Sequence, residues 1–265
     1  MFALEVLRGA LALRFVLPAL VTSVVATAIS WSFLPDAPTY LIPAYPTSLS
    51  SNIWALLAGP VTGLVSVLYV RLVAWADGHK PQRWHRVWVP IVALGMLGAV
   101  SIPFPQLLGN GRDVARSAFL GQLGAPLLLA LLFLRPAATV LCLGSGAPGG
   151  LFTPSLAVGA MLGGVLGLPW SWLWPGVPPG SFALLGAAAM LAASTQGPIS
   201  TIVLMMELTG HARAAIVPLL LAVATATLVA RTIEPRSIYD ARLSDAQVRA
   251  RQQARERASE DALPG

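Results

Sequence analysis

The sequence predicts an all-α, polytopic membrane protein whose helices are tilted, broken and in places re-entrant. Hydrophobic residues make up 56% of the 265 residues and charged residues only 11%, against about 25% charged in soluble domains. No Lys, Arg, Asp or Glu stands between Arg135 and Glu207. A soluble domain needs charged surface along its whole length, so this stretch must face lipid or other protein segments.

Apolar runs follow one another along most of the chain, but several are short. A helix that crosses the hydrocarbon core needs about 20 residues, and clusters of Gly and Pro at 144–150, 175–180 and 196–198 cut some runs well below that length. Interrupted segments must be buried in protein or line a watery cavity, and they are typical of ion sites in transporters. The runs are approximately 9–33, 53–75, 87–103, 117–134, 137–143, 151–168, 182–193, 199–209 and 214–230.

The charges of the loops predict how the chain is oriented. The loop 77–86 holds three Lys or Arg residues and is predicted to be cytoplasmic by the positive-inside rule. The loop 34–52 has no Lys or Arg, and the tryptophan-rich loop 168–180 has no charge, so both are predicted to be extracytoplasmic. The Arg-rich segment that starts at Arg231, including the polar tail 244–265, is predicted to be cytoplasmic.

The formal net charge of +6 does not indicate a nucleic-acid partner. The basic residues stand at the ends of apolar runs and form no patch with interleaved aromatic residues. Arg135, beside Pro136, separates two apolar runs. We interpret it as a residue at a helix junction whose side chain extends to the membrane interface. No metal ion or organic cofactor is predicted.

The stretch GSGAPGGLFTP, from Gly144 to Pro154, predicts an anion site. Its Gly and Pro residues break the chain, and a new helix is expected to begin around Phe152–Pro154, because proline is tolerated in a first helical turn. The N–H groups and positive dipole end of such a helix bind anions without a formal charge. We expect this to suit a conducted anion, since a fixed cation would hold it too tightly to release it.

Gly159, Gly163 and Gly167 repeat every four residues in the helix expected after this break. Small residues at that spacing are typical of close helix–helix contacts in membranes. We therefore predict that these three glycines form a packing face rather than part of the anion site.

These motifs resemble those of the CLC family of chloride channels and chloride–proton antiporters. GSGAPGGLFTP is similar to the family's second-half selectivity motif G-x-F-x-P, here Gly150, Leu151, Phe152, Thr153 and Pro154. A second similar stretch is LLAASTQGPISTIVLMMELTG, in which a short helix ends and the chain restarts at Gly-Pro. A third is IEPRSIYDARL, near the end of the apolar region.

The resemblance implies a chloride site and names its residues. In the family, backbone amides at the start of the helix bind chloride, which would assign Leu151 and Phe152, flanked by Gly150 and Pro154. A tyrosine hydroxyl contacts the central chloride, which would assign Tyr239. Chloride and the lipid bilayer are then the expected partners, with no cofactor.

The resemblance also divides the chain. It implies that residues 1–33 hold the last helices of the first inverted repeat, and that 34–52 is an extracytoplasmic loop. Residues 53–243 would form the second repeat, with a pore-lining helix and a terminal helix that carries Tyr239. The serine and glutamate motifs of the family's first half do not occur in this sequence. We therefore expect a fragment that does not conduct by itself.

The proton-coupling position distinguishes two activities. The family's proton-carrying glutamate aligns with Val6, and a valine cannot carry a proton. The sequence thus favours a voltage-gated-type chloride channel, with a proton-coupled chloride antiporter as the alternative. The resemblance further implies a homodimer and a location in the cell (inner) membrane. An intramembrane serine hydrolase built on Ser145 or Ser194 is the third alternative, although it lacks a nearby general base, and we predict that the protein is not an enzyme.

Overall fold

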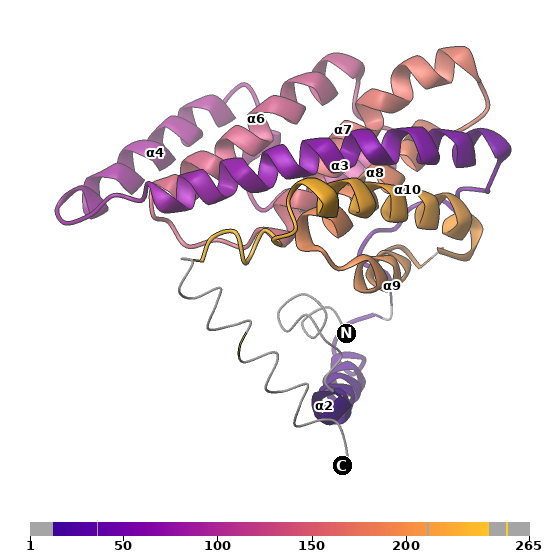
Figure 1. Cartoon of the computed structure of the whole chain (residues 1–265), viewed down its shortest axis with the longest axis horizontal. Helices are drawn as coiled ribbons and strands as arrows, with labels where there is room; N and C mark the ends of the chain where they lie inside the picture. Colours follow the sequence, from indigo (N-terminus) through magenta and orange to yellow (C-terminus); the bar gives the residue numbers. More distant parts are fainter. Residues whose placement is uncertain (1–12, 36, 211, 244–252, 254–265) are drawn as a thin grey trace.

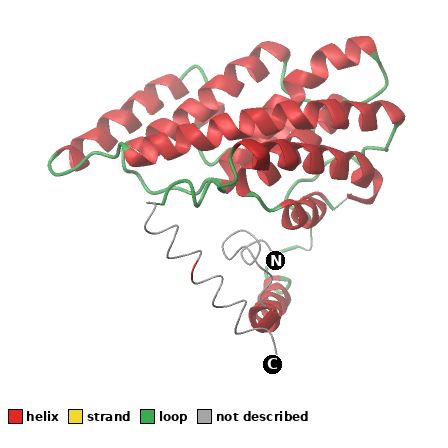
Figure 2. Ribbon diagram, in the orientation of Figure 1, coloured by secondary structure: helices red, strands yellow, loops and turns green. Residues whose placement is uncertain are grey.

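The computed structural model describes residues 13–35, 37–210, 212–243 and 253, and every regular element within those ranges is a helix (Figure 2). The predicted all-α class is confirmed. The position Val6 and nearly all of the predicted tail 244–265 lie outside the described residues. The elements are α2 (Leu13–Ser30), α3 (Leu49–Gly78), α4 (His85–Ser101), the 3-10 turn η1 (Pro105–Leu107), α5 (Arg112–Phe119), α6 (Ala125–Gly144), α7 (Phe152–Leu173), α8 (Pro179–Thr195), α9 (Pro198–Thr209) and α10 (Ala212–Ile233).

Helix α8 lies in the middle of the bundle. All its residues from Gly180 to Thr195 are buried, as expected for a helix that is apolar all round. It packs chiefly against α7 and also against α10 and α3, while α3 runs along α10 (Figure 1). Helix α2 stands apart from this bundle in the same view. Four helices in the described part of the chain are long and apolar enough to cross a membrane: α3, α6, α7 and the 215–233 part of α10.

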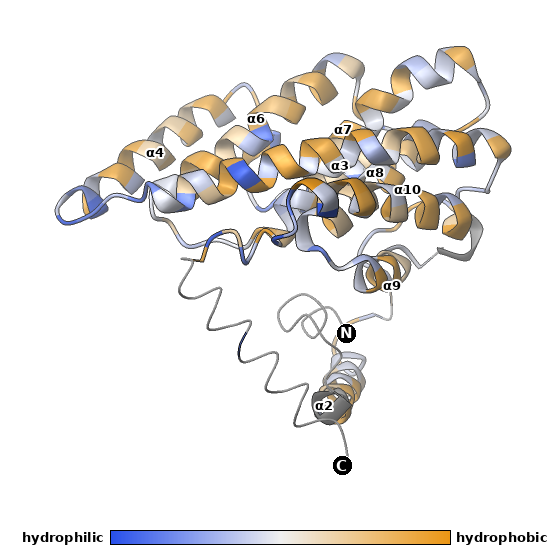
Figure 3. Cartoon of the chain, in the orientation of Figure 1, coloured by the Kyte–Doolittle hydropathy of each residue, from blue (hydrophilic) through white to orange (hydrophobic). Residues whose placement is uncertain are grey.

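The distribution of side chains is that of a membrane protein. Leu64, Leu68 and Leu72 lie four residues apart on α3 and are exposed, whereas Thr62 and Ser66 on the same helix are buried. The Thr62 hydroxyl donates a hydrogen bond to the Ala58 carbonyl at 2.8 Å, which makes its burial inexpensive. Hydrophobic residues cover the helices, and hydrophilic residues gather at the α3–α4 loop (Figure 3). The chain is therefore a polytopic membrane protein.

At each end of α3, a side-chain contact connects two segments that were predicted, from the charges of the loops, to lie on the same side of the membrane. At its start, the Trp170 indole Nε1–H donates to Ser50 Oγ at 3.0 Å, which connects the two predicted extracytoplasmic segments. At its end, Asp77 pairs with Arg242 at 2.7 Å, which connects the two predicted cytoplasmic ones. The 30 residues of α3 separate these contacts by about 45 Å at 1.5 Å per residue.

Several boundaries differ from the prediction. Helix α3 begins at Leu49, so the first loop ends before residue 52, because Ser48 and Ser51 form a reciprocal capping box. The predicted breaks at 144–150, 175–180 and 196–198 are confirmed. The predicted break at Pro136 is wrong, since α6 continues through it. Prolines are tolerated within transmembrane helices; the Thr139 hydroxyl, in the turn after Pro136, donates to the Arg135 carbonyl at 3.0 Å.

Candidate anion-binding site

Helix α7 begins where the sequence predicted. Leu151 is the residue that precedes its first turn, and the Ser155 N–H is the first to bond back, to the Leu151 carbonyl at 3.0 Å. Pro154 in this turn has no N–H to contribute. Gly146, in the loop that leads to α7, has a φ of +91°, a backbone conformation that favours glycine. The positive end of the α7 dipole therefore points toward the loop.

This helix start forms one wall of a partly open cavity of about 210 Å³. Gly150, Leu151 and Pro154, three of the predicted site residues, line it together. The opposite wall comes from α6 and from the loop before α5, and it includes Leu107, Gly109, Asn110, Arg135, Thr139 and Cys142. A cavity of this volume accommodates a small anion with some of its water.

Arg135 supplies a positive charge at this cavity. Its side chain is buried at 3% exposure, and its guanidinium donates from Nη1 to the Leu107 carbonyl at 2.9 Å and from Nη2 to the Gly109 carbonyl at 2.8 Å. The buried Nε has no hydrogen-bond partner, and no carboxylate among the described residues forms a salt bridge with Arg135. A buried charge without a counter-ion is strongly unfavourable, so an anion in the cavity would compensate it.

The structure corrects two expectations about this residue. Arg135 does not extend to the membrane interface, because two loop carbonyls bind its guanidinium inside the protein. The cavity is also not lined by uncharged dipoles alone. The arginine had one recognisable signal in the sequence, since an ionisable residue within an apolar region is a functional candidate by default.

Gly111 brings the loop close enough to bind Arg135. Its φ is +98°, and a Cβ at this position would lie 2.8 Å from Arg135 Nη2 and 2.9 Å from the Ala157 Cβ. Any larger residue would therefore push the loop away from both α6 and α7. The glycine is required by both the backbone conformation and the close approach.

Phe152 and Tyr239 do not belong to the lining of this cavity. Both are partly buried and pack against the hydrophobic core. The terminal helix expected around Tyr239 is absent from residues 234–243, where the chain forms turns. Pro235 follows the last helical turn and has no N–H to extend it, and the Ser237 hydroxyl accepts the N–H of Asp240 at 3.1 Å.

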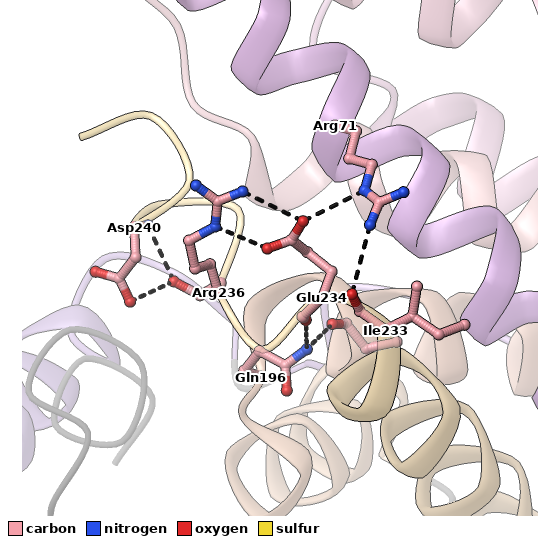
Figure 4. A network of polar contacts seen from close by, with 8 residues as sticks. Arg71, Gln196, Ile233, Glu234, Arg236 and Asp240 are labelled. Atoms are coloured by element: carbon pink, nitrogen blue, oxygen red, sulfur yellow. Dashed lines mark hydrogen bonds and ion pairs between the residues drawn. The ribbon is translucent and has the colours of Figure 1, made fainter. Parts of the chain in front are cut away.

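A polar network holds the chain immediately after α10 (Figure 4). The Glu234 carboxylate accepts hydrogen bonds from Arg236 Nε at 2.7 Å and from Arg71 Nε of α3 at 3.3 Å. The Gln196 side-chain amide donates to the Glu234 carbonyl at 3.4 Å, and Arg231 donates to the Gln196 carbonyl at 3.0 Å. This network joins α3, the α8–α9 break and the end of α10.

Glu234 gives a pH-dependent stability. Hydrogen bonds from Arg236, together with its charge and that of Arg71, hold the pKa of Glu234 below its ordinary value of 4.5, although burial opposes this. The carboxylate thus stabilises the folded chain fully above pH 4.5, and the stabilisation is lost as the pH falls through the lowered pKa. We expect Glu234→Gln to lower stability by about 1–3 kcal/mol at neutral pH, and thermal melts should show the gap closing in acid.

The serines considered for a hydrolase are engaged with the backbone. The Ser145 hydroxyl donates to the Cys142 carbonyl at 2.7 Å, and the Ser194 hydroxyl donates to the Leu191 carbonyl at 3.2 Å. Neither arrangement provides the general base that an activated serine requires.

Interrupted helices around a partly open cavity in a polytopic bundle define a class of membrane protein that includes ion transporters. Comparison with known proteins places the chain more narrowly. The family model described as "Voltage gated chloride channel" matches residues 1–231. The H(+)/Cl(-) exchange transporter ClcA of Vibrio parahaemolyticus is 32% identical over 206 residues, which cover 75% of this chain and 44% of that protein. The ClcA of Yersinia pestis is 32% identical over 202 residues, covering 73% and 42%.

Solved structures agree with this placement. A slow cyanobacterial Cl-/H+ antiporter superimposes with a TM-score of 0.68 at 25% identity, covering 78% of this chain and 49% of that one. A CLC-type fluoride/proton antiporter shares the fold, with a TM-score of 0.73 at 23% identity over 91% of this chain and 59% of the other. The chain belongs to the voltage gated chloride channel family. It spans less than half the length of the curated relatives it matches.

Proposed function

We propose that this chain supplies one half of the anion pathway of a proton-coupled chloride exchanger in the cell (inner) membrane. The observation that carries the proposal is the cavity in which the start of α7 meets the buried Arg135. The relatives from Vibrio parahaemolyticus and Yersinia pestis are named H(+)/Cl(-) exchange transporters, which favours exchange over the channel activity that the sequence analysis preferred. Family members are transporters and not enzymes.

The electrostatics of the cavity suit a small monovalent anion. The α7 dipole contributes partial positive charge at Leu151 and Phe152, and Arg135 adds a full charge whose two Nη groups are already bonded to carbonyls. These bonds use two of the five guanidinium N–H groups, and the carbonyl oxygens partly offset the positive charge that the guanidinium presents to an anion. Attraction of this kind allows an ion to bind and also to leave.

Chloride binding tests the role of the α7 start. Replacing the Leu151 amide by an ester, with leucic acid (2-hydroxy-4-methylpentanoic acid) incorporated at position 151, removes one N–H at the cavity lining and keeps the side chain. We expect the chloride affinity of the purified chain, measured by calorimetry against gluconate, to fall about tenfold, as expected for a hydrogen bond to a charged group worth about 1.5 kcal/mol. The same ester at Leu49, the first residue of α3, should leave affinity unchanged. Equal chloride affinity in the unmodified chain and in both ester variants would contradict the proposal.

Passive chloride passage is the second candidate, because Val6 occupies the position that the resemblance assigns to the proton-carrying glutamate. Co-expressing this chain with the part of the Vibrio parahaemolyticus relative that it does not cover would provide both halves of a pathway. Proton movement driven by a chloride gradient in vesicles would support exchange, and chloride flux without protons would support passive passage. We propose that this chain alone gives no flux in the same vesicles.

We also propose a homodimer. Ile199 and Val203 of α9 and Leu220 and Leu228 of α10 are exposed apolar residues, and the resemblance implies a subunit contact on these helices. Light scattering of the purified chain distinguishes a dimer from a monomer.

A further inference from the structure

Two ion pairs to one helix enclose the segment that carries Tyr239. Glu234 pairs with Arg71 of α3 at 3.3 Å, and Arg242 pairs with Asp77 of the same helix at 2.7 Å. The order of charges is opposite on the two sides. Along α3 the base Arg71 precedes the acid Asp77, whereas along the segment the acid Glu234 precedes the base Arg242. A slip of the segment along α3 would bring like charges together, so the pattern favours one register.

The spacing of the two pairs forces the segment to fold. Arg71 and Asp77 are six residues apart on a helix, a distance of about 9 Å. Glu234 and Arg242 are eight residues apart, and an extended chain of that length would reach about 26 Å. Both pairs can form together only if the intervening chain turns back. It does so around Tyr239, in a series of turns from 238 to 242.

Further contacts fix this turn between the two ion pairs. The Ile238 N–H donates to the Ser194 carbonyl at the end of α8 at 2.7 Å, and the Ile238 side chain is fully buried. The Ala241 N–H donates to the Ser237 carbonyl at 2.8 Å. Tyr239 thus follows directly on an anchored residue, and its ring packs against the hydrophobic core.

Both ion pairs involve a carboxylate that is largely buried. The side chains of Glu234 and Asp77 are only 7% and 16% exposed, whereas the side chain of Arg71 is 57% exposed. Asp77 also pairs with Lys80 and Glu234 also pairs with Arg236, each at 2.7 Å. Loss of either cross-segment pair therefore leaves the carboxylate with a local partner but removes the connection between the segment and α3. The segment would then relax away from α3 rather than keep its register.

We propose that Glu234, Asp77 and Arg242 are positioning residues that hold Tyr239 in place through these two ion pairs to α3. The inference rests on the proposed function and on the family resemblance, which assigns the Tyr239 hydroxyl to the transported anion. Neither ion pair touches the anion. They set where the hydroxyl lies, and through it the affinity of the half-site for chloride.

The experiment places 3-fluorotyrosine at position 239 of the full chain and follows its fluorine resonance during a chloride titration. We expect one narrow resonance that shifts with chloride. Glu234→Gln, Asp77→Arg and Arg242→Asp should each broaden or split it and weaken apparent chloride affinity about tenfold, a loss typical of a displaced contact group. The double variant Asp77→Arg/Arg242→Asp should recover affinity to within about threefold. Arg86→Gln, at an exposed arginine in the first turn of α4, is the control.

Melting temperatures of all variants are recorded, and binding is compared where each is folded, because a merely structural ion pair would change stability without moving the resonance. Unchanged resonances and affinities in the single variants overturn the inference, even if the wild-type signal responds to chloride and so supports the proposed function. If the single variants alter the resonance but the wild type does not respond to chloride, the positioning stands and the anion role of Tyr239 fails. Failure of the charge swap to restore the resonance overturns the ion-pair mechanism.

Discussion

Replacing Gly163 with alanine is expected to destabilise the folded chain by about 3 kcal/mol or more, at the upper end of the cost of overpacking. A Cβ on Gly163 would lie 2.2 Å from the Phe182 carbonyl oxygen and 2.9 Å from the Gly186 Cα. Both atoms belong to the backbone of α8 and cannot rotate away. Helix α8 is buried on every side, so it has no free direction in which to move, and the contact between α7 and α8 would have to open.

Two alanine variants control for helix propensity and position. Gly164→Ala adds the same methyl group one residue along α7, where it meets only the Leu128 methyl groups at 3.3 Å, and a side chain can adjust. Gly98→Ala meets nothing within 4 Å and should stabilise α4 by about 0.5–1 kcal/mol. Thermal unfolding in detergent, followed by circular dichroism, measures all three. If Gly163→Ala melted together with Gly164→Ala, the close contact would be refuted.

The sequence predicted this contact and most helix ends because both depend on local chemistry. Gly159, Gly163 and Gly167 all face α8, where an added Cβ would meet atoms at 2.4 Å or less, so the predicted packing face is confirmed. The breaks before α7, α8 and α9 coincide with clusters of Gly and Pro residues, whereas the single proline Pro136 lies inside α6. The start of α3 was missed because a capping box of two serines is easily overlooked inside a polar loop.

The environment of Arg135 could not be predicted in the same way. Its hydrogen-bond partners, Leu107 and Gly109, precede it by 28 and 26 residues, and no local pattern connects them. Two general rules competed for this residue, namely that long cations extend to the interface and that intramembrane charges are functional candidates. The second rule applies here, because the Leu107 and Gly109 carbonyls bind the guanidinium inside the protein. The uninterrupted course of α6 through Pro136 was missed because a single proline is tolerated within a transmembrane helix.

The positions of Phe152 and Tyr239 show the limit of a resemblance. It assigned both to one anion site with Gly150, Leu151 and Pro154, yet only the last three share the lining of the cavity. The chain spans less than half the length of the relatives it matches, and the resemblance implies a site to which the motifs of the first half, absent from this sequence, also contribute. The joint role of the five residues therefore stays a prediction, which chloride titration of this chain can test.

Replacing Arg135 with methionine is expected to produce the largest loss of anion binding. Methionine keeps much of the volume and removes the charge. At an effective dielectric constant of about 20, a unit charge about 8 Å from an anion contributes about 2 kcal/mol, or roughly thirtyfold in affinity. A cavity of about 210 Å³ keeps any bound anion within such a distance of its wall. Calorimetric titration of chloride into the purified variant measures the loss.

Arg135→Lys separates the charge from the hydrogen bonds. Lysine retains the positive charge but lacks the two Nη groups that donate to the Leu107 and Gly109 carbonyls. One carbonyl would be left unpaired, so the substitution should lower the free energy of unfolding by about 1–3 kcal/mol. Its chloride affinity should nevertheless stay within about threefold of wild type, because the field at the cavity depends on charge. Arg135→Met should lose both properties. If lysine and methionine weakened chloride equally, Arg135 would be a structural anchor for the loop, and the anion would owe its binding to the α7 dipole alone.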